Sequence, residues 1–219
     1  MKKTLNKTTN KMSKYIAFDT ETTGLDVNIN NLLTACFIVL DSNLIELDRL
    51  NISLKSENYT INAKAMEVNK IDIVKHDQTS KDLIDTKAQL INFLKKNKTN
   101  FYLTPIAHNA AFDIGFIKKL LGVHYNNYFS YNSVDTIVIA NFLKMCGKLP
   151  EQQPVSLSKL SEYYGLGGSV PQRQIGKEAF HTSEYDTEMT VKLLKKFVEL
   201  NIFESKTQKV SPKKRCFEN

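Results

Sequence analysis

A short apolar segment that ends in two acidic residues constrains the fold of this chain more than any other feature of its sequence. Residues 15–25 read YIAFDTETTGL, which predicts a buried strand followed by a Thr-Thr-Gly turn. Alternate residues of a strand share a face, so Asp19 and Glu21 should lie side by side, opposite Ile16 and Phe18. Two such carboxylates repel each other, and a divalent cation relieves the repulsion by binding oxygens of both. An exposed strand end before a glycine turn would give the same pattern, so the choice depends on acidic clusters later in the chain.

The composition is that of a globular chain with an anionic partner. With 219 residues and 42% hydrophobic residues, the chain is long enough for one domain with a substantial core. The net charge of +7 favours nucleic acid as the partner, although lysine-rich ends contribute much of this excess. We expect a flexible basic tail at 1–13, a polar basic tail at 201–219, and one domain at 14–200 between them.

Two kinds of protein are disfavoured by what the sequence lacks. No apolar run approaches about 18 residues, so no membrane span is expected, and residues 1–13 lack the apolar segment of a secretory signal. Cys36, Cys146 and Cys216 are far apart and form no C-x-x-C pair, which argues against a zinc site or a disulfide framework. We therefore expect a reducing, cytoplasmic location.

Local patterns predict a hairpin first and then an alternation of helices and strands. The expected strands after the first one are 32–40, 44–54, 101–108 and 133–135. The expected helices are 63–68, 80–96, 110–121, 136–145, 156–164 and 183–200. A mobile loop rich in glycine is expected at 166–179. This order predicts an α/β fold, with a mixed sheet and helices on both of its faces.

Two further acidic clusters follow. HNAAFD runs from a predicted strand into a helix and places Asp113 in its first turn, and HTSEYD opens the last helix with His181 before it and Asp186 within it. Each has a structural explanation: the helix dipole favours Asp113, Ser183 and Asp186 resemble a capping arrangement, and a histidine in a loop is usually solvated. Glu188, further along the last helix, should face water.

The clusters are more informative together than alone. Four acids from three separate segments, each at a strand end or a helix start, suit a site that holds two cations about 3.5–4 Å apart for phosphoryl chemistry. A histidine in a mobile segment beside them could act as a general base near neutral pH.

The segments FDTETTGL, HNAAFD and HTSEYD, in this order, resemble the three motifs of the DEDDh, or DnaQ-like, 3'→5' exonucleases. That family includes the proofreading ε subunit of bacterial replicative polymerase and ribonuclease T. His181 precedes the last aspartate by the DEDDh spacing, whereas the sister DEDDy group has a tyrosine at the position of Thr182. INAKAMEVNKI, SVDTIVIANFL and SLSKLSEYYGL extend the resemblance over 14–200, although the family usually has His-Gly where this chain has Asn69-Lys70.

The resemblance implies a ribonuclease H-like fold with a five-stranded mixed sheet, and it implies roles for the acidic residues. Asp19, Glu21 and Asp186 would bind the ion that activates the attacking water, and Asp19 would also bridge to a second ion. Asp113 would complete the site, partly through water, and His181 would deprotonate the nucleophile.

The resemblance also implies substrate contacts. The residues that would meet the 3'-terminal nucleotide are Thr22, Thr23, Gly24 and Leu25. Those near the path of the strand would be His108, Asn109 and Phe112. Phe112 repeats with Phe116 at helical spacing, so a core position explains it equally well, and Asp135 is expected to cap its own helix.

The function implied is a 3'→5' exonuclease that uses two Mg²⁺ or Mn²⁺ ions to release nucleoside monophosphates, with single-stranded DNA as the first choice of substrate. An enzyme that trims RNA remains an alternative, because discrimination rests on 2'-hydroxyl contacts that a sequence does not reveal. A nucleic-acid-binding module without catalysis is a further alternative. Association with a polymerase is not readable from the sequence, since the end VSPKKRCFEN contains no recognisable docking helix.

Overall fold

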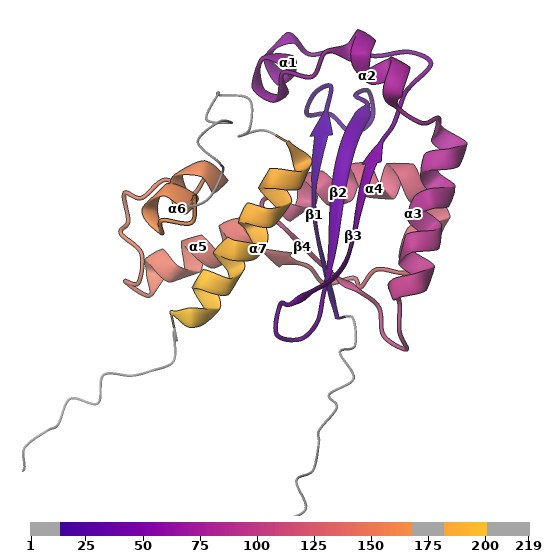
Figure 1. Cartoon of the computed structure of the whole chain (residues 1–219). Helices are drawn as coiled ribbons and strands as arrows, with labels where there is room; N and C mark the ends of the chain where they lie inside the picture. The colour runs from indigo at the N-terminus through magenta and orange to yellow at the C-terminus, as the bar shows by residue number, and fades with distance from the viewer. Residues whose placement is uncertain (1–13, 168–181, 201–219) are drawn as a thin grey trace, which may run out of the picture.

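The computed structural model describes residues 14–167 and 182–200, and one five-stranded sheet forms its centre (Figure 1). The strands lie in the order β3-β2-β1-β4-β5. Their bounds are β1 (Tyr15–Thr22), β2 (Leu32–Leu40), β3 (Glu46–Ser53), β4 (Thr104–Ala107) and β5 (Val134–Asp135). β2 pairs antiparallel with β1 and β3, whereas β4 pairs parallel with β1 and β5. The predicted mixed sheet of five strands is therefore confirmed.

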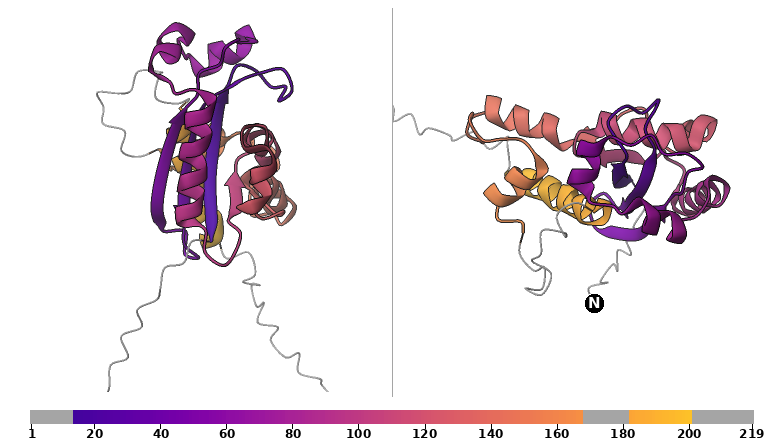
Figure 2. Two further views of the ribbon diagram at one scale, coloured as in Figure 1. Left: turned by 90° about the vertical axis from the view of Figure 1, so that its right-hand side faces the viewer. Right: turned by 90° about the horizontal axis from the view of Figure 1, so that it is seen from above.

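Helices cover both faces of this sheet, as the two views in Figure 2 show. They are α1 (Ala63–Asn69), α2 (Ile73–Thr79), α3 (Leu83–Asn97), α4 (Ala110–Leu121), the 3₁₀ helix η1 (Gly122–Asn127), α5 (Thr136–Met145), α6 (Leu157–Tyr163) and α7 (Ser183–Glu199). One apolar cluster packs α3, α4 and η1 against one face of the sheet, and a second packs α7 against the other. A third cluster joins α5 and α6 to α7.

β1 lies between these two cores, and its alternation places the acidic residues. Ile16 and Phe18 are fully buried in the core beneath α3 and α4, whereas Ala17 is buried in the core beneath α7. Asp19 and Glu21 follow Ala17 in the same alternation, so they project toward the side of α7. Figure 1 shows that α7 begins beside the carboxyl end of β1. The predicted division of the strand into two faces is confirmed.

Two elements begin later in the structure than the sequence predicts, one because of a helix cap and one because of a turn. α3 begins at Leu83 rather than at residue 80, because the Asp82 side chain accepts the N–H of Asp85 (2.8 Å) and caps the helix there. β3 begins at Glu46 rather than at residue 44, because Leu44 adopts a φ of 59° and extends the turn.

α2 was not predicted. Its N-cap, Asp72, accepts N–H groups of the first helical turn. His76 is buried, and its Nε2 lies 2.9 Å from the carbonyl oxygen of Leu54. The helix has only seven residues and is anchored by a contact with a residue far along the chain, so helical periodicity could not reveal it. η1 was missed as well.

Several predictions fall on residues that the structure does not describe. These are the tails at 1–13 and 201–219, residues 168–179 of the expected loop, and His181. They stay predictions.

Replacing Phe18 by alanine should destabilise the domain by about 3–5 kcal/mol, because it opens a cavity where the side chain is fully buried. Urea denaturation followed by circular dichroism measures the difference. Ile84→Ala on α3 is the matched control, since Ile84 is 79% exposed and its loss should change the stability by less than about 0.5 kcal/mol. Equal effects of both substitutions would contradict the assigned core.

Candidate active site

Three carboxylates from two distant segments meet at the carboxyl end of β1. Asp19 and Glu21 come from β1, and Asp186 comes from the first turn of α7. One carboxylate oxygen of each lies within 4.8 Å of those of the other two. The three side chains are half-buried, and the convergence expected from the sequence is present for all three.

The start of α7 aims Asp186 at β1. The N-cap is Thr182, whose hydroxyl accepts the N–H of Tyr185 (3.2 Å). The alternative explanation of this segment, in which Ser183 caps the helix, is wrong: Ser183 is buried, and its hydroxyl lies 3.2 Å from Oγ1 of Thr34 on β2. Because Thr182 caps the helix, the Asp186 carboxylate is not engaged in a capping arrangement and faces the other acids.

Hydrogen bonds from Thr20 hold the Asp113 side chain against β1. It is almost fully buried at the start of α4, and its Oδ1 accepts hydrogen bonds from both the backbone N–H (2.9 Å) and the hydroxyl (2.7 Å) of Thr20. A carboxylate favoured only by the helix dipole would stay at the surface. Asp113 lies close enough to oppose the ionisation of Asp19 and Glu21, but it is not among the three acids whose oxygens lie within 4.8 Å of one another.

The acids disfavour one another's charge. Burial, followed by the charges of Asp113, Asp186 and Glu21, raises the pKa of Asp19 well above its ordinary value of 3.8. Burial and the charges of Asp186 and Asp113 raise the pKa of Glu21 to about 8. Burial raises the pKa of Asp186 to about 7, and it raises that of Asp113 to about 7 despite the opposing hydrogen bonds from Thr20.

The donor set fits a hard divalent cation. Within residues 14–167 and 182–200, no hydrogen bond or salt bridge reaches the carboxylates of Asp19, Glu21 or Asp186. Buried carboxylates without partners are costly, and either protons or a metal ion must compensate them. Oxygen ligands alone suit Mg²⁺ and Mn²⁺ better than metals that prefer nitrogen or sulfur.

The turn after β1 is rigid and tightly packed. The Thr22 hydroxyl donates to the carbonyl of Gly24 (2.7 Å), and the Thr23 hydroxyl donates to that of Thr60 (2.7 Å). A Cβ on Gly24 would lie 2.4 Å from Oδ1 of Asn30, so a larger residue would have to displace the Asn30 side chain from its bonds to Asp26 and Thr60. Leu25 is 80% exposed and is therefore free to meet a ligand.

Asn69 supports this turn, a role that the sequence analysis missed. Its side-chain amide donates to the carbonyl of Thr22 (3.0 Å) from the end of α1, and its Oδ1 accepts the N–H of Ile71 (3.1 Å). Its neighbour Lys70 adopts a φ of 54°, in the left-handed region that favours glycine. Asn69-Lys70 stands where the resembled family usually has His-Gly. In the sequence, this departure was the only signal of the role of Asn69.

Hydrogen bonds to the Asp135 carboxylate fix the position of the HNAAFD segment, and they involve the starts of two helices. Asp135 accepts N–H groups from Asn109 (3.2 Å) and Ala110 (2.8 Å) as well as from Ile137 (2.8 Å). It therefore fixes the start of α4 in addition to capping α5, which was the only role predicted for it. His108 Nδ1 lies 2.8 Å from the hydroxyl of Thr136, and burial lowers the pKa of this histidine.

Phe112 contributes to the core. Its ring centroid lies 5.2 Å from that of Phe116, and the side chain packs, partly buried, against the cluster beneath α4. The structural explanation of this residue is therefore supported, and a contact with nucleic acid stays a prediction.

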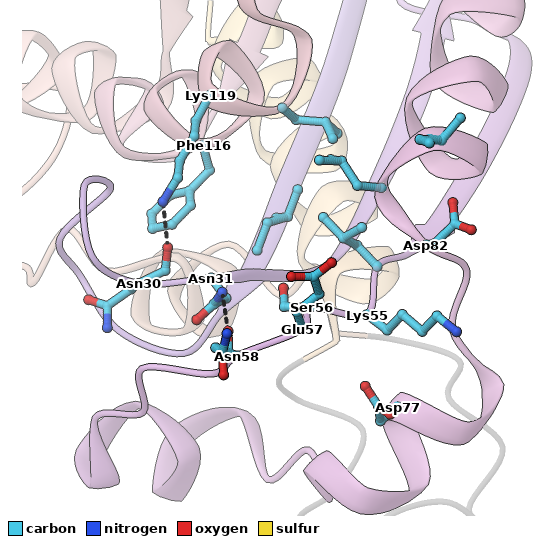
Figure 3. Close-up of a pocket in the computed structure, with 15 residues that line it drawn as sticks. Asn30, Asn31, Lys55, Ser56, Glu57, Asn58, Asp77, Asp82, Phe116 and Lys119 are labelled. Carbon is cyan, nitrogen blue, oxygen red and sulfur yellow. Dashed lines mark hydrogen bonds between the residues drawn. The ribbon is translucent and has the colours of Figure 1, made fainter.

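Two hollows adjoin this cluster, one lined by Glu21 and the other by Asp186. One of about 600 Å³ is lined by Glu21, Asn69, Lys70 and Thr182, among others. The other, of about 530 Å³, is lined by Asp186 and Tyr185 together with residues of α6. A larger hollow of about 1070 Å³ lies elsewhere, between α3, α4 and residues 54–58, and none of the four acids lines it (Figure 3).

A family model described as an RNase T exonuclease matches residues 16–194. The chain belongs to this exonuclease family. The PolC-type DNA polymerase III of Streptococcus pyogenes serotype M2 (strain MGAS10270) is 28% identical over 181 residues, which cover 82% of this chain and 11% of the polymerase. This exonuclease-family chain therefore spans only a small part of that relative.

Solved structures of exonuclease I share the fold. The zinc-bound complex of E. coli exonuclease I with single-stranded DNA has a TM-score of 0.63 and 17% identity, covering 84% of this chain and 40% of that one. Exonuclease I of Methylocaldum szegediense has a TM-score of 0.67 and 14% identity, covering 85% and 40%. The predicted ribonuclease H-like fold is confirmed for this family member. Among its described helices, none has the length and apolar character needed to span a membrane.

In EDTA, the melting temperature should fall as the pH is raised from about 5 to about 8. The pKa values of Glu21 (about 8), Asp113 and Asp186 (about 7) exceed their ordinary values of 4.5 and 3.8, so between these limits the folded state binds more protons than the unfolded state. The stability present at low pH is therefore lost as the pH rises. Scanning fluorimetry measures this slope.

Two controls accompany this measurement. Asp19→Asn should flatten the slope because it removes one of the repelling charges, and saturating Mn²⁺ should restore the stability at pH 8 because the ion replaces the protons. A melting temperature that rises with pH in EDTA would contradict the electrostatics of the cluster.

Proposed function

We propose that this chain is a 3'→5' exonuclease of the DEDDh type that removes nucleoside monophosphates from single-stranded DNA with two divalent metal ions. The observation that carries this proposal is the cluster of Asp19, Glu21 and Asp186, whose oxygens lie within 4.8 Å of one another without a protein donor among the described residues. Membership of the exonuclease family supports the same chemistry.

Each acidic residue has a role in this proposal. Asp19, Glu21 and Asp186 would hold one divalent ion, and Asp19 with Asp113 would serve a second. Mg²⁺ or Mn²⁺ at this place would supply Lewis acidity and lower the pKa of a bound water. His181 takes the proton of the attacking water. The hydrogen bonds from Thr20 fix the orientation of the Asp113 carboxylate for this role.

The two hollows offer room for the nucleotides on either side of the bond that is cut. The rigid turn formed by Thr22, Thr23, Gly24 and Leu25 meets the 3'-terminal nucleotide, and His108, Asn109 and Phe112 lie along the strand. Exonuclease I of E. coli has been solved with single-stranded DNA and with a zinc ion bound, which supports this class of substrate and the use of a metal. The net charge of +7 favours a polyanion.

The wider setting is part of the proposal. The exonuclease domain comprises 14–200, with basic tails at either side, and the location is cytoplasmic. Association with a polymerase is suggested by the PolC-type relative, of which this chain matches a small part.

Asp19→Ala and Asp186→Ala should each lower the rate of 3' shortening by more than about 100-fold, because each removes a metal ligand. The test is a gel with 3'- and 5'-labelled single-stranded DNA and RNA in Mg²⁺, Mn²⁺ or EDTA. Asp85→Ala on α3 removes an exposed aspartate away from the cluster and should leave the rate unchanged.

Several outcomes of this gel would overturn the proposal. Shortening from the 5' end would exclude the polarity, and shortening that persists in EDTA would exclude the metal. Tight binding of the strand without shortening would favour a binding module. Faster shortening of RNA than of DNA would assign the enzyme to RNA.

His181→Ala should lower kcat by about 10²–10⁴-fold and leave KM within about threefold, because a general base acts on the reaction rather than on binding. Steady-state rates on a short labelled strand separate the two constants. An unchanged kcat would show that another group takes the proton.

A further inference from the structure

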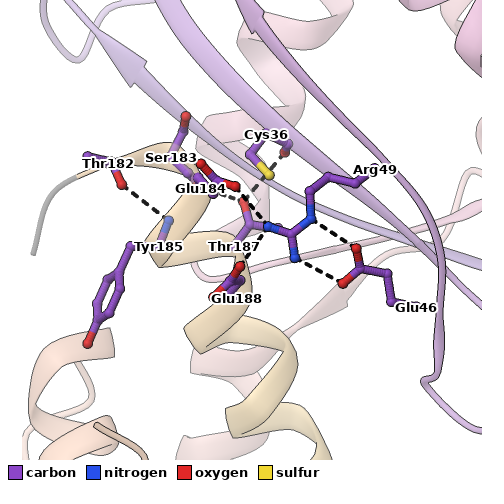
Figure 4. A network of polar contacts seen from close by, with 9 residues as sticks. All are labelled: Cys36, Glu46, Arg49, Thr182, Ser183, Glu184, Tyr185, Thr187 and Glu188. Atoms are coloured by element: carbon purple, nitrogen blue, oxygen red, sulfur yellow. Dashed lines mark hydrogen bonds and ion pairs between the residues drawn. The ribbon is translucent and has the colours of Figure 1, made fainter. Parts of the chain in front are cut away.

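One arginine of the sheet binds the helix that carries Asp186. The Arg49 guanidinium, on β3, lies 3.0 Å from Glu184 and 2.6 Å from Glu188 through Nη1. Its Nε and Nη2 bind the two oxygens of Glu46, each at 2.9 Å (Figure 4). Glu188, expected from the sequence to face water, is thus paired with a residue 139 positions away.

The geometry of a helix explains why this contact bears on the site. Residues two apart on a helix differ by about 200° in direction, and residues four apart by only about 40°. Glu184 and Glu188 therefore project from one side of α7, and Asp186 projects from nearly the opposite side. Holding the first side fixes the rotation of the helix that aims Asp186 at Asp19 and Glu21.

Apart from apolar packing further along the helix, the other polar contacts between the start of α7 and the sheet are weaker. The Ser183 hydroxyl lies 3.2 Å from that of Thr34, and the Thr187 hydroxyl donates to the Cys36 carbonyl at 3.4 Å. Both are neutral contacts toward the long end of the hydrogen-bonding range. Charge-assisted bonds to a guanidinium are shorter and stronger.

Charge gives a second reason for an arginine here. Like charges four residues apart on a helix repel each other, and Asp186 is also repelled by Asp19 and Glu21. Arg49 offsets part of the negative charge of Glu184 and Glu188, so the start of α7 is held on its outer side while its inward side faces other carboxylates.

We propose that Arg49 is a positioning residue, which fixes the rotation of α7 through Glu184 and Glu188 so that Asp186 meets Asp19 and Glu21 at the metal site. The inference rests on the proposed function, since it assigns Arg49 a part in that reaction. It differs from a plain contribution to stability, because it predicts a loss of metal affinity that exceeds the loss of fold stability, and the two quantities are measured separately.

Arg49→Gln should weaken the binding of Mn²⁺ by about tenfold, as the loss of other groups that orient metal ligands does. Electron paramagnetic resonance of free Mn²⁺ measures this affinity without any turnover. Glu46→Gln is the matched control, since it removes a partner of Arg49 but leaves both bonds to α7 in place. Lys196→Gln breaks an ion pair at the far end of α7, and both controls should stay within about twofold of the parent.

Turnover and stability provide the second measurement. Arg49→Gln should lower kcat about tenfold and raise the Mn²⁺ concentration needed for half-maximal rate, while the melting temperature in EDTA stays within about 3 °C of the parent. Arg49→Lys should recover part of both losses because it keeps the charge. Glu188→Gln should also lower kcat and Mn²⁺ affinity. Combining it with Arg49→Gln should add little to either loss, since both substitutions break the same ion pair.

The inference and the proposed function fail in different ways. A parent protein that binds Mn²⁺ but shortens no strand would overturn the proposed function, and the Mn²⁺ affinities would still decide the role of Arg49. An Arg49→Gln variant with the Mn²⁺ affinity of the parent would overturn the inference. A loss of affinity accompanied by a fall of more than about 10 °C in melting temperature would do so too, because Arg49 would then be structural.

Discussion

Repulsion among four carboxylates at the carboxyl end of β1 is the constraint on which the rest of the structure depends. Asp19, Glu21, Asp113 and Asp186 raise one another's cost of ionisation in a half-buried place where no described donor satisfies three of them. A chain gains nothing in stability from this arrangement, because buried charges of one sign oppose folding. Such a cluster is kept together only by the surrounding scaffold, and it becomes favourable when a cation enters.

The scaffold holds each acid from outside the cluster. β1 is hydrogen-bonded on both sides, to β2 and to β4, and its apolar residues are buried in two separate cores. Thr20 holds Asp113, and Asp135 fixes the start of the helix that carries it. On the opposite face, Arg49 holds the start of α7. Contacts outside the cluster thus resist a repulsion that the acids themselves cannot relieve.

The relation to known exonucleases concerns one domain. The match takes in 11% of the PolC-type polymerase and 40% of each exonuclease I chain. In both cases it includes most of the present chain. What is shared with exonuclease I is the fold of the matched part, whereas the parts of those proteins that lie outside the match have no counterpart in the comparison. The chemistry can therefore be argued from the site, and the substrate and partners must be argued from the hollows and charges around it.

The sequence by itself determined the features that depend on near neighbours. The alternation of β1 predicted which side Asp19 and Glu21 would take, helical spacing predicted α4 and α7, and two of the acidic motifs predicted the meeting of Asp19, Glu21 and Asp186. Only the tertiary structure decided that Thr182 rather than Ser183 caps α7, that α2 forms around a buried His76, and that Glu188 binds Arg49. The physical reason is that strand and helix periodicities follow from bonds between residues a few positions apart, whereas caps, anchors and ion pairs depend on which surfaces the packed core brings together.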